Sequence, residues 1–380
     1  MELILKQYDI PLLRFSATND SSTPEIEVHW INEDQRYLLP LDMELSPEGI
    51  SRWMRRRTIP RNRAYVNRLL AKCGLNANRP MGILALCKGL SVDDSYWVVE
   101  EGFEGTFEKY NLFENRFSEV LALIAFTGYG SSNRSSLASS PEFTTNGMLP
   151  KCWRRISGKV TLYKGGTDGG YNTGAEPYCE YYAAQVAASM GIDAIPYGLS
   201  QWKGRLCSTC ELFTDIDHAY MPIGNLVQRG GFDAVAAYYE NLGEPFQKAF
   251  RDMLVFDAVI CNTDRHYGNF GFMIDNKTNT IAAPAPLFDH GNSLFNQAGP
   301  EDYESPEAFQ QYIDTLVPCV YDDFFATAKR FMADENWEQL RKLLGFRFKR
   351  HVRYNLPPKR LKLMEEQVRK RAMRLLENKD

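Results

Sequence analysis

The chain has 380 residues, of which 44% are hydrophobic and 13% aromatic, enough to bury at least one large core and to form two lobes. Its formal net charge of −4 provides no overall attraction for nucleic acid or for an anionic membrane. No secretory signal is evident, no uncharged apolar run is long enough to span a bilayer, and the eight cysteines are scattered. We therefore expect a globular, cytoplasmic protein with reduced cysteines and no membrane partner.

The N-terminal part of the chain is expected to form a subdomain of its own over residues 1–110. Residues 1–45 show short strand and turn patterns, and residues 46–73 predict two helices interrupted near Pro60, the first capped by Ser46. Seven arginines on this helix pair suggest a DNA-binding helix–turn–helix. Arginine-rich surface helices are more often solvated or docking faces, and we favour that interpretation; direct contact with nucleic acid is not expected.

Residues 111–213 are expected to form an antiparallel α+β lobe. A stretch rich in Gly, Ser, Thr and Asn at 128–147 follows an apolar helical run, and its composition predicts a segment that is mobile or wraps around a ligand. Cys207 and Cys210 form a lone CxxC in a strand-like context, which is weak evidence for zinc, so we interpret the pair as part of a strand. Further patterns predict a hairpin at 148–166 that turns at Ser157-Gly158, a helix at 176–190 and two strands within 192–214.

Residues 214–380 have a mainly helical pattern. One helical run ends near Ile260, and the residues from 271 to 295 predict a hairpin that turns at 276–279. Strands in the first half and helices in the second indicate an α+β fold with a bilobal plan.

The stretch CNTDRHYGNFGF at 261–272 concentrates polar side chains directly after an apolar helical run. Phosphoryl transfer needs a carboxylate that orients the attacking hydroxyl and an oxygen ligand that holds magnesium, and protein kinases place the two five residues apart, Asp before Asn. Asp264 and Asn269 have this spacing. With Asp264 as candidate catalytic acid/base, His266 is assigned to loop geometry, and Arg265 is left open between a phosphate contact and a solvent-exposed position.

Asp289 is the candidate for a second magnesium ligand. It follows an apolar strand pattern and precedes Gly291 in APLFDHGNSLF. Magnesium prefers carboxylate and amide oxygens, together with phosphates and waters. The predicted hairpin between Asn269 and Asp289 would bring its two ends close together. As an isolated residue Asp289 could equally form a turn; its place after the loop favours a ligand.

Lys164 and Glu180 are a candidate ion pair. Lys164 shares one face of its predicted strand with Val160 and Leu162, and a lysine on a core-facing side is unfavourable unless it meets an anion. Glu180 lies on a small-residue face of the predicted helix at 176–190. The pair would place the lysine against nucleotide phosphates; two unrelated surface charges are the alternative.

Together, the segments NTDRHYGN, LFDHGNSLF and TTNGMLPK resemble the HipA-like serine/threonine kinases of bacterial toxin–antitoxin systems, best over residues 110–345. The resemblance implies a bilobal protein-kinase-like fold with an extra N-terminal subdomain, ATP and Mg²⁺ as cofactors, and transfer of phosphate to a protein substrate. A DRHxxN segment followed by DHG is also similar to phosphoinositide kinases, which share the wider fold.

The resemblance also implies individual roles. Asp264 takes the catalytic position, Asn269 and Asp289 bind magnesium, Lys164 holds phosphates, Glu180 positions Lys164, and Gly147 with its neighbours cradles phosphate through backbone amides. Glu211 to Phe213 would line the adenine pocket. In the family, a serine or threonine of the loop before the first hairpin is autophosphorylated; Ser139, Ser140, Thr144 and Thr145, within 131–146, are the candidates here. The loop lacks a G-x-G-x-x-G pattern, so phosphate would be held by Gly147 and neighbouring backbone amides.

Two other functions stay open. One is a lipid or small-molecule kinase on the same scaffold, which would use the same residues. The other is a DNA-binding regulator whose kinase-like half binds only nucleotide or a protein. A toxin role and a separate antitoxin partner are implied by the resemblance alone.

Overall fold

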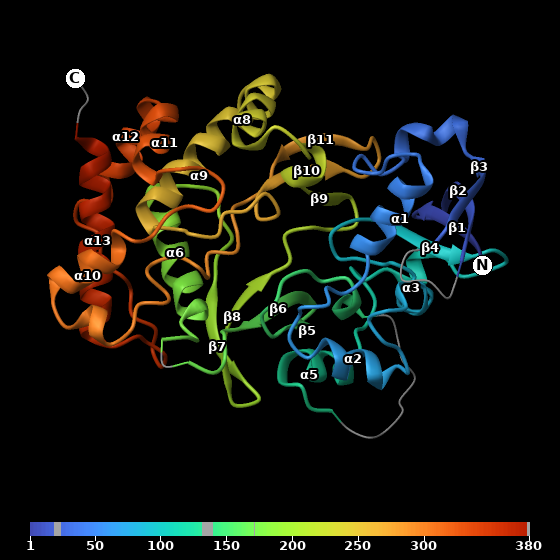
Figure 1. Ribbon diagram of the computed structural model, residues 1–380, viewed down its shortest axis with the longest axis horizontal. Coiled ribbons are helices and arrows are strands. Elements are labelled where there is room, and N and C mark those ends of the chain that lie inside the picture. The colour runs from blue at the N-terminus through green and yellow to red at the C-terminus, as the bar shows by residue number, and fades with distance from the viewer. Residues whose placement is uncertain (19–23, 131–139, 171, 378–380) are drawn as a thin grey trace. The chain divides into compact units, whose positions relative to one another are not determined.

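A computed structural model describes residues 1–18, 24–130, 140–170 and 172–377 (Figure 1). The chain divides into two compact units. The first comprises Met1–Lys164, Glu211–Met221 and Met273–Ala282, and the second Gly165–Cys210, Pro222–Phe272 and Ala283–Asp380. This division groups the chain differently from the three segments predicted from the sequence, and that three-part organisation remains a prediction.

The first unit opens with an antiparallel sheet in the order β3-β2-β1-β4. Leu3 lies opposite Phe15 and Leu5 opposite Leu13, and all four side chains are buried. This register follows from the apolar alternation of the two strands, which turns one face of the sheet toward the core. The strands are β1 (Glu2–Gln7), β2 (Ile10–Ala17), β3 (Ile26–Ile31) and β4 (Tyr96–Glu100).

The two helices predicted within 46–73 are present as α1 and α2. Ser46 caps α1, because its side-chain oxygen accepts a hydrogen bond of 3.0 Å from the Gly49 amide. Trp53 and Met54 of α1 are buried in the core formed by the sheet. The helical elements of this unit are η1 (Glu33–Leu38), α1 (Pro47–Arg56), α2 (Val66–Lys72), α3 (Pro80–Cys87), α4 (Phe107–Tyr110), α5 (Glu119–Thr127) and η2 (Pro141–Phe143).

Three predicted hairpins are confirmed. The first joins β5 (Lys151–Ile156) and β6 (Lys159–Gly165) and turns at Ser157 and Gly158, both with positive φ. The second, β7 (Gly198–Trp202) with β8 (Arg205–Glu211), carries Cys207 and Cys210 as free thiols within β8. The third joins β10 (Gly271–Asp275) and β11 (Thr280–Pro284) in a three-stranded sheet with β9 (His218–Pro222), ordered β11-β10-β9.

The expectation of a mobile or ligand-wrapping segment at 128–147 is wrong for its last part. Glu142 and Phe143 are fully buried, and Glu142 forms a buried ion pair with Arg63 of the first unit. The Trp153 backbone amide donates a hydrogen bond of 2.8 Å to Glu142 Oε1. The composition of the segment did not predict this packing, because it depends on the ion pair between Glu142 and Arg63, which is distant in sequence. This pair holds a polar segment inside the unit.

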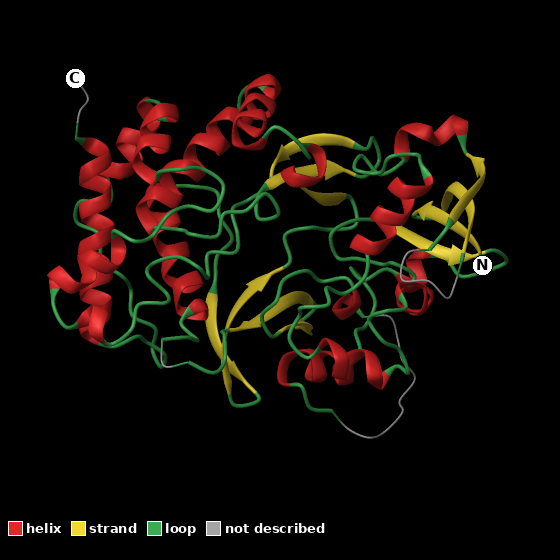
Figure 2. Cartoon of the chain, viewed as in Figure 1, coloured by secondary structure: helices red, strands yellow, loops and turns green. Residues whose placement is uncertain are grey.

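The second unit is predominantly helical (Figure 2), and most of its helices lie within residues 214–380, where the sequence predicted a helical pattern. Every residue of α9 from Met253 to Ile260 is buried, and α11, α12 and α13 all contact this helix. No helix in the described part of the chain combines the length and apolar character needed to cross a membrane. The helical elements are α6 (Glu176–Met190), α7 (Ile223–Leu226), α8 (Gly231–Leu242), α9 (Phe246–Ile260), η3 (Glu301–Tyr303), α10 (Pro306–Ile313), α11 (Phe324–Phe331), α12 (Asp334–Arg341) and α13 (Pro358–Leu376).

Candidate active site

The polar loop predicted to carry chemistry begins where α9 ends. Cys261 terminates the helix in the left-handed conformation, with φ of 53°, and its amide donates to the Asp257 carbonyl. The amide of the buried Asn262 donates to the same carbonyl at 3.1 Å, and its side chain donates to Asp257 Oδ1 at 3.0 Å. Asn262 Oδ1 then accepts a bond from the Asp264 amide at 3.1 Å. The last turn of α9 therefore sets the backbone position of Asp264.

Arg265 is buried, so the solvent-exposed position considered from the sequence is wrong. Its side chain is 1% exposed and pairs with the fully buried Asp257, through Nε to Oδ2 at 2.9 Å and Nη2 to Oδ1 at 3.1 Å. Burial by itself would lower the pKa of Arg265, but the pairing with Asp257 outweighs it and raises that pKa. The arginine is thus a permanent buried cation beneath the loop.

Arg265 also connects the two candidate magnesium ligands. Its Nη1 donates to the Asn269 carbonyl at 3.0 Å and to the Phe288 carbonyl at 2.7 Å. Because one nitrogen binds both oxygens, the backbone of Asn269 lies beside the residue that precedes Asp289. Arg265 Nη2 lies 3.1 Å from His290 Nδ1, which fixes the residue that follows Asp289 as well.

Asp264 is held from both sides. Its Oδ2 accepts a bond of 2.8 Å from Asn292 Nδ2, and its carbonyl accepts one of 3.2 Å from Asn269 Nδ2. Asn292 is itself fixed, because its carbonyl accepts bonds from the amide and hydroxyl of Thr263, at 3.0 and 3.1 Å. Asn296 Nδ2 donates to Asn292 Oδ1 at 2.9 Å. Asp264 therefore presents one oriented, partly exposed carboxylate.

Asp289 lies directly after a short paired stretch. The Leu287 amide donates to the Asp193 carbonyl at 3.0 Å, and Leu287 forms a parallel bridge with Ala194. Asp289 itself adopts a left-handed backbone, with φ of 56°, and its amide donates to Tyr197 Oη at 3.1 Å. A non-glycine residue in this conformation is uncommon and is held here by the bonds around it.

The exposed His266 shapes the loop. Its Nδ1 accepts a bond of 3.0 Å from the Gly268 amide, and its carbonyl accepts one of 2.9 Å from the Asn269 amide. A Cβ on Gly268 would lie 2.9 Å from the imidazole ring, so a larger residue here would displace the His266 side chain. These contacts support the interpretation of His266 as a loop-shaping residue.

Glu180 of α6 lies next to the segment that carries Asp289. It is fully buried and accepts a hydrogen bond from Ser208 on β8. A Cβ on Gly291 would lie 3.2 Å from Glu176 Cβ and 3.7 Å from Glu180 Oε1, so the chain passes close to α6 at this glycine. Two acids one helical turn apart therefore face the segment that follows Asp289.

The other nucleotide-binding candidates belong to the first unit. Lys164 is the penultimate residue of β6 and is buried, as its strand face predicted. The segment from Glu211 to Phe213 is anchored to β6, because the Leu212 amide donates to the Val160 carbonyl at 2.9 Å. Gly147 has a φ of 93°, and the ammonium of Lys151 lies where its Cβ would be. Since Lys164 and Glu180 lie in different units, their ion pair remains a prediction.

Three of the four candidate autophosphorylation residues are described; Ser139 lies outside the described residues. Ser140 and Thr144 are buried, and the Thr144 hydroxyl donates to the Leu90 carbonyl at 2.8 Å. The Thr145 hydroxyl donates to the Pro141 carbonyl at 2.7 Å and accepts a bond from Trp153 Nε1 at 2.9 Å. In this conformation, the two threonine hydroxyls bond within the first unit.

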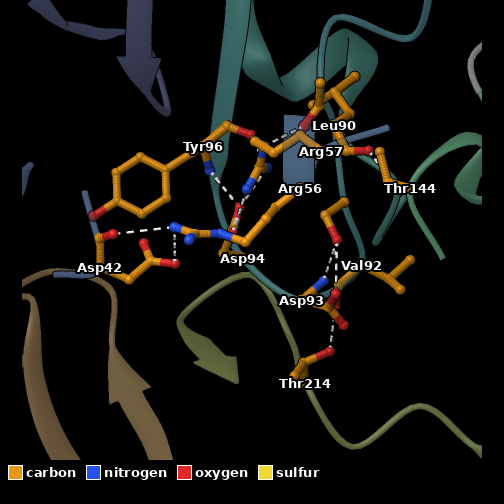
Figure 3. A network of polar contacts seen from close by, with 12 residues as sticks. Asp42, Arg56, Arg57, Leu90, Val92, Asp93, Asp94, Tyr96, Thr144 and Thr214 are labelled. Atoms are coloured by element: carbon orange, nitrogen blue, oxygen red, sulfur yellow. Dashed lines mark hydrogen bonds and ion pairs between the residues drawn. The ribbon is translucent and has the colours of Figure 1, made fainter. Parts of the chain in front are cut away.

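The arginine-rich helices do not form a solvated face throughout. Figure 3 shows Arg57, buried, donating to both Asp94 carboxylate oxygens at 2.7 and 2.8 Å, and Arg56 paired with Asp42 at 2.8 Å. Arg57 also donates to the Gly89 and Tyr96 carbonyls. Because Arg57 is buried in the interior of the first unit, it is not part of an exposed surface.

The network in Figure 3 continues into the segment after β8. The Thr214 hydroxyl donates to the Val92 carbonyl, and Ser91 Oγ donates to Asp93 Oδ2 at 3.0 Å. Burial, reinforced by the neighbouring Asp94 carboxylate, raises the pKa of Asp93 to about 6. This unit thus holds an acid that titrates near neutral pH.

The residues that sequence reasoning missed are mainly those that hold the candidates in place. Asp257 lay inside an apolar helical run, and Asn292 directly follows the DHG segment. A charged residue on the buried face of a helix that leads into a polar loop was the available signal for Asp257. No sequence signal pointed to Tyr197.

The donor set fits a magnesium ion. Asn269 directs its amide nitrogen to the Asp264 carbonyl, which leaves the amide oxygen as the ligand atom. Asp289 adds a partly exposed carboxylate on the segment that Arg265 connects to Asn269. Carboxylate and amide oxygens are hard ligands of the kind that magnesium binds. No cluster of three or more His, Cys, Asp or Glu suited to a metal occurs among the described residues, so a pure amino-acid cage is not indicated there.

The mixed α/β architecture with antiparallel sheets is that of the HipA-like kinases, which confirms the resemblance at the level of the fold. HipA of Shewanella oneidensis MR-1, solved with HipB and its operator DNA, superposes with a TM-score of 0.52 and 13% identity over 98% of this chain and 97% of that one. The proinflammatory kinase CtkA of Helicobacter pylori superposes with a TM-score of 0.51 and 16% identity over 62% of this chain and 91% of that one.

Sequence comparison leads to the same group of proteins. The serine/threonine-protein kinase CtkA of Helicobacter pylori (strain J99 / ATCC 700824) is 27% identical over 135 residues, which are 32% of this chain and 41% of that protein. The match therefore spans about two fifths of this relative's length. No protein-family model matches the chain.

Proposed function

We propose that this chain is an ATP- and Mg²⁺-dependent serine/threonine protein kinase of HipA type. The main observation behind the proposal is that Arg265 Nη1 donates hydrogen bonds to the carbonyls of both Asn269 and Phe288. These two bonds bring a candidate amide ligand and a candidate carboxylate ligand together beside the oriented carboxylate of Asp264. This is the set of groups that phosphoryl transfer to a hydroxyl requires.

In this proposal Asp264 accepts the proton of the attacking hydroxyl, and the Asn292 bond keeps its carboxylate in one orientation. Asn269 and Asp289 hold the magnesium, which, when bound, neutralises charge on the ATP phosphates. His266 shapes the loop through Gly268 rather than moving a proton.

The first unit supplies the remaining nucleotide contacts. Lys164 holds phosphates, and Glu180, which belongs to the second unit, positions Lys164; both roles are those implied by the resemblance to HipA-like kinases. Gly147 offers backbone amides to phosphate, and the backbone from Glu211 to Phe213 lines the adenine pocket.

Regulation and partners are further parts of the proposal. We infer a protein substrate and autophosphorylation within 131–146. The HipA neighbour is solved with HipB and operator DNA, which supports a toxin role and a separate antitoxin partner here. The eight free cysteines support a cytoplasmic location.

The proposal is tested with purified protein and γ-labelled ATP, with and without Mg²⁺. We expect phosphate incorporation into the protein itself, abolished in Asp264→Asn and reduced in Asp289→Asn at the same limiting Mg²⁺ concentration. Glu338→Gln is the control, since Glu338 is exposed on α12 and pairs with Arg341. Undiminished transfer in both active-site variants would refute the site, and transfer to phosphoinositide vesicles but not to protein would favour the lipid kinase.

A further inference from the structure

Arg371 of α13 is a buried arginine that forms no ion pair with an acid among the described residues. Its side chain is 6% exposed, and no carboxylate lies within 4.0 Å of it in the described part of the chain. Its Nη2 has no hydrogen-bond partner among the described residues. Buried arginines are normally paired with acids, as Arg265 is here.

The surroundings of Arg371 are aromatic. The guanidinium lies over Phe324 and Phe325 of α11, at 5.3 and 4.6 Å from the ring centroids. Within the described part of the chain, its Nε donates a hydrogen bond of 2.6 Å to the Ala258 carbonyl. Two rings and one carbonyl replace only part of the hydration that this cation loses on folding.

Arg371 is therefore not explained by its contribution to stability. Burial lowers its pKa, which shows that the surroundings disfavour the charged form. A methionine of similar length would fill the same space and keep contact with both rings without a buried charge. An unfavourable group that persists next to a candidate active site points to a role in activity.

The position of the Ala258 carbonyl, to which Arg371 donates, indicates what this role is. Ala258 lies in the last turn of α9, three residues before Cys261, where the carbonyls lack intrahelical partners. Two other carbonyls of this turn accept hydrogen bonds from outside the helix. The Asp257 carbonyl accepts one from the Asn262 amide, and the Ile260 carbonyl accepts one of 2.7 Å from the Leu294 amide. A cation at a helix C-terminus is also favoured by the helix dipole. Arg371 thus restrains the turn that sets the backbone of Asp264.

We propose that Arg371 is a positioning residue, which holds the C-terminal turn of α9 and, through it, the Asp264 loop in the geometry for phosphoryl transfer. The inference rests on the proposed function. It also assigns a catalytic purpose to the C-terminal helix α13, whose apolar face otherwise serves packing.

The test compares Arg371→Met, Arg371→Lys and the control Arg374→Met. Arg374 lies one turn further along α13, is exposed, and stacks on Phe325 at 3.9 Å. We expect Arg371→Met to keep or raise the melting temperature while kcat falls about 10- to 100-fold with KM for ATP little changed. Arg371→Lys, which retains a donor for the Ala258 carbonyl, should recover part of kcat, and Arg374→Met should leave kcat unchanged.

Hydrogen–deuterium exchange provides a readout that does not depend on activity. In Arg371→Met, amides of residues 257–264 should exchange faster than in the wild type, while those of α6 should not change. Unchanged exchange at 257–264, or a loss of kcat that merely follows a lowered melting temperature, would overturn the inference. If the wild type transfers no phosphate, the proposed function fails, and the exchange experiment still decides whether Arg371 orders the loop.

Discussion

Arg265 and Asp257 form an ion pair in which both side chains are almost completely excluded from solvent, with Nε 2.9 Å from Oδ2. The pair joins the last turn of α9 to the loop that carries Asp264. The same arginine binds the Asn269 and Phe288 carbonyls. One buried cation therefore organises both segments of the candidate site.

We expect Arg265→Met to lower the free energy of unfolding by about 3–5 kcal/mol, because it leaves the Asp257 charge buried and unpaired. Chemical denaturation measures this change, and Arg341→Met, at an exposed pair with Glu338, is the control. The double variant Arg265→Met, Asp257→Leu should regain much of the stability but no kinase activity. Recovery of activity in the double variant would contradict the organising role of the pair.

Asn292 is expected to orient the Asp264 carboxylate. Asn292→Ala removes the 2.8 Å bond and should lower kcat about tenfold with KM for ATP little changed. Asn292→Asp places a second carboxylate beside Asp264 and should lower kcat more than Asn292→Ala does. Asn296→Ala, which acts on Asp264 only through Asn292, should have the smallest effect in steady-state kinetics. If the kcat values of the three variants fell in the reverse order, Asn292 would not orient the Asp264 carboxylate.

Magnesium dependence tests the two candidate ligands. Asn269→Ala and Asp289→Asn should each raise the Mg²⁺ concentration for half-maximal activity about tenfold or more, because the first removes an oxygen ligand and the second replaces a charged carboxylate with a neutral amide. Titration of activity with Mg²⁺ at saturating ATP measures this. His266→Ala should leave the Mg²⁺ requirement near that of the wild type; a shift as large as that of Asp289→Asn would make His266 part of the metal site.

Asn279 is expected to anchor the turn between β10 and β11. Its side chain donates to the Tyr37 and Leu39 carbonyls at 2.8 and 2.7 Å, and it accepts a bond of 3.3 Å from the Tyr96 hydroxyl. Asn279→Gly preserves the left-handed backbone, with φ of 52°, but removes these bonds. We expect a loss of about 2–4 kcal/mol in the free energy of unfolding. An unchanged denaturation midpoint would show that these bonds contribute nothing net.

Asp93 should make stability pH-dependent. Its pKa in the folded protein is raised to about 6, above the value of about 3.9 expected in the unfolded chain. The folded state therefore binds the proton more tightly, so stability falls as the pH rises from about 4 through 6. Asp93→Asn should flatten this part of the profile and stabilise the protein at pH 7 by about 1 kcal/mol, a modest figure because Asp93 is partly exposed. An unchanged pH profile of the melting temperature would contradict the shift.

The features that the sequence predicted correctly depend on residues close together along the chain. The Ser46 cap, the turn at Ser157 and Gly158 and the strand context of Cys207 all follow from local preferences and short-range periodicity. The spacing of Asp264 and Asn269 is equally local, because one short loop sets it. The resemblance to HipA-like kinases rested on the same short segments, and the fold confirms it.

Burial and pairing across long separations were decided by the tertiary structure alone. Arg265 was misjudged because its environment depends on Asp257 and on the segment at 288–290, and Glu142 because its partner Arg63 lies 79 residues earlier. Arg371 meets Ala258 across 113 residues. The free energy of a charge depends on what surrounds it in space, which local periodicity does not contain. The amino-acid sequence therefore determined which groups could perform the chemistry, and the packing around α9 determined how they are held.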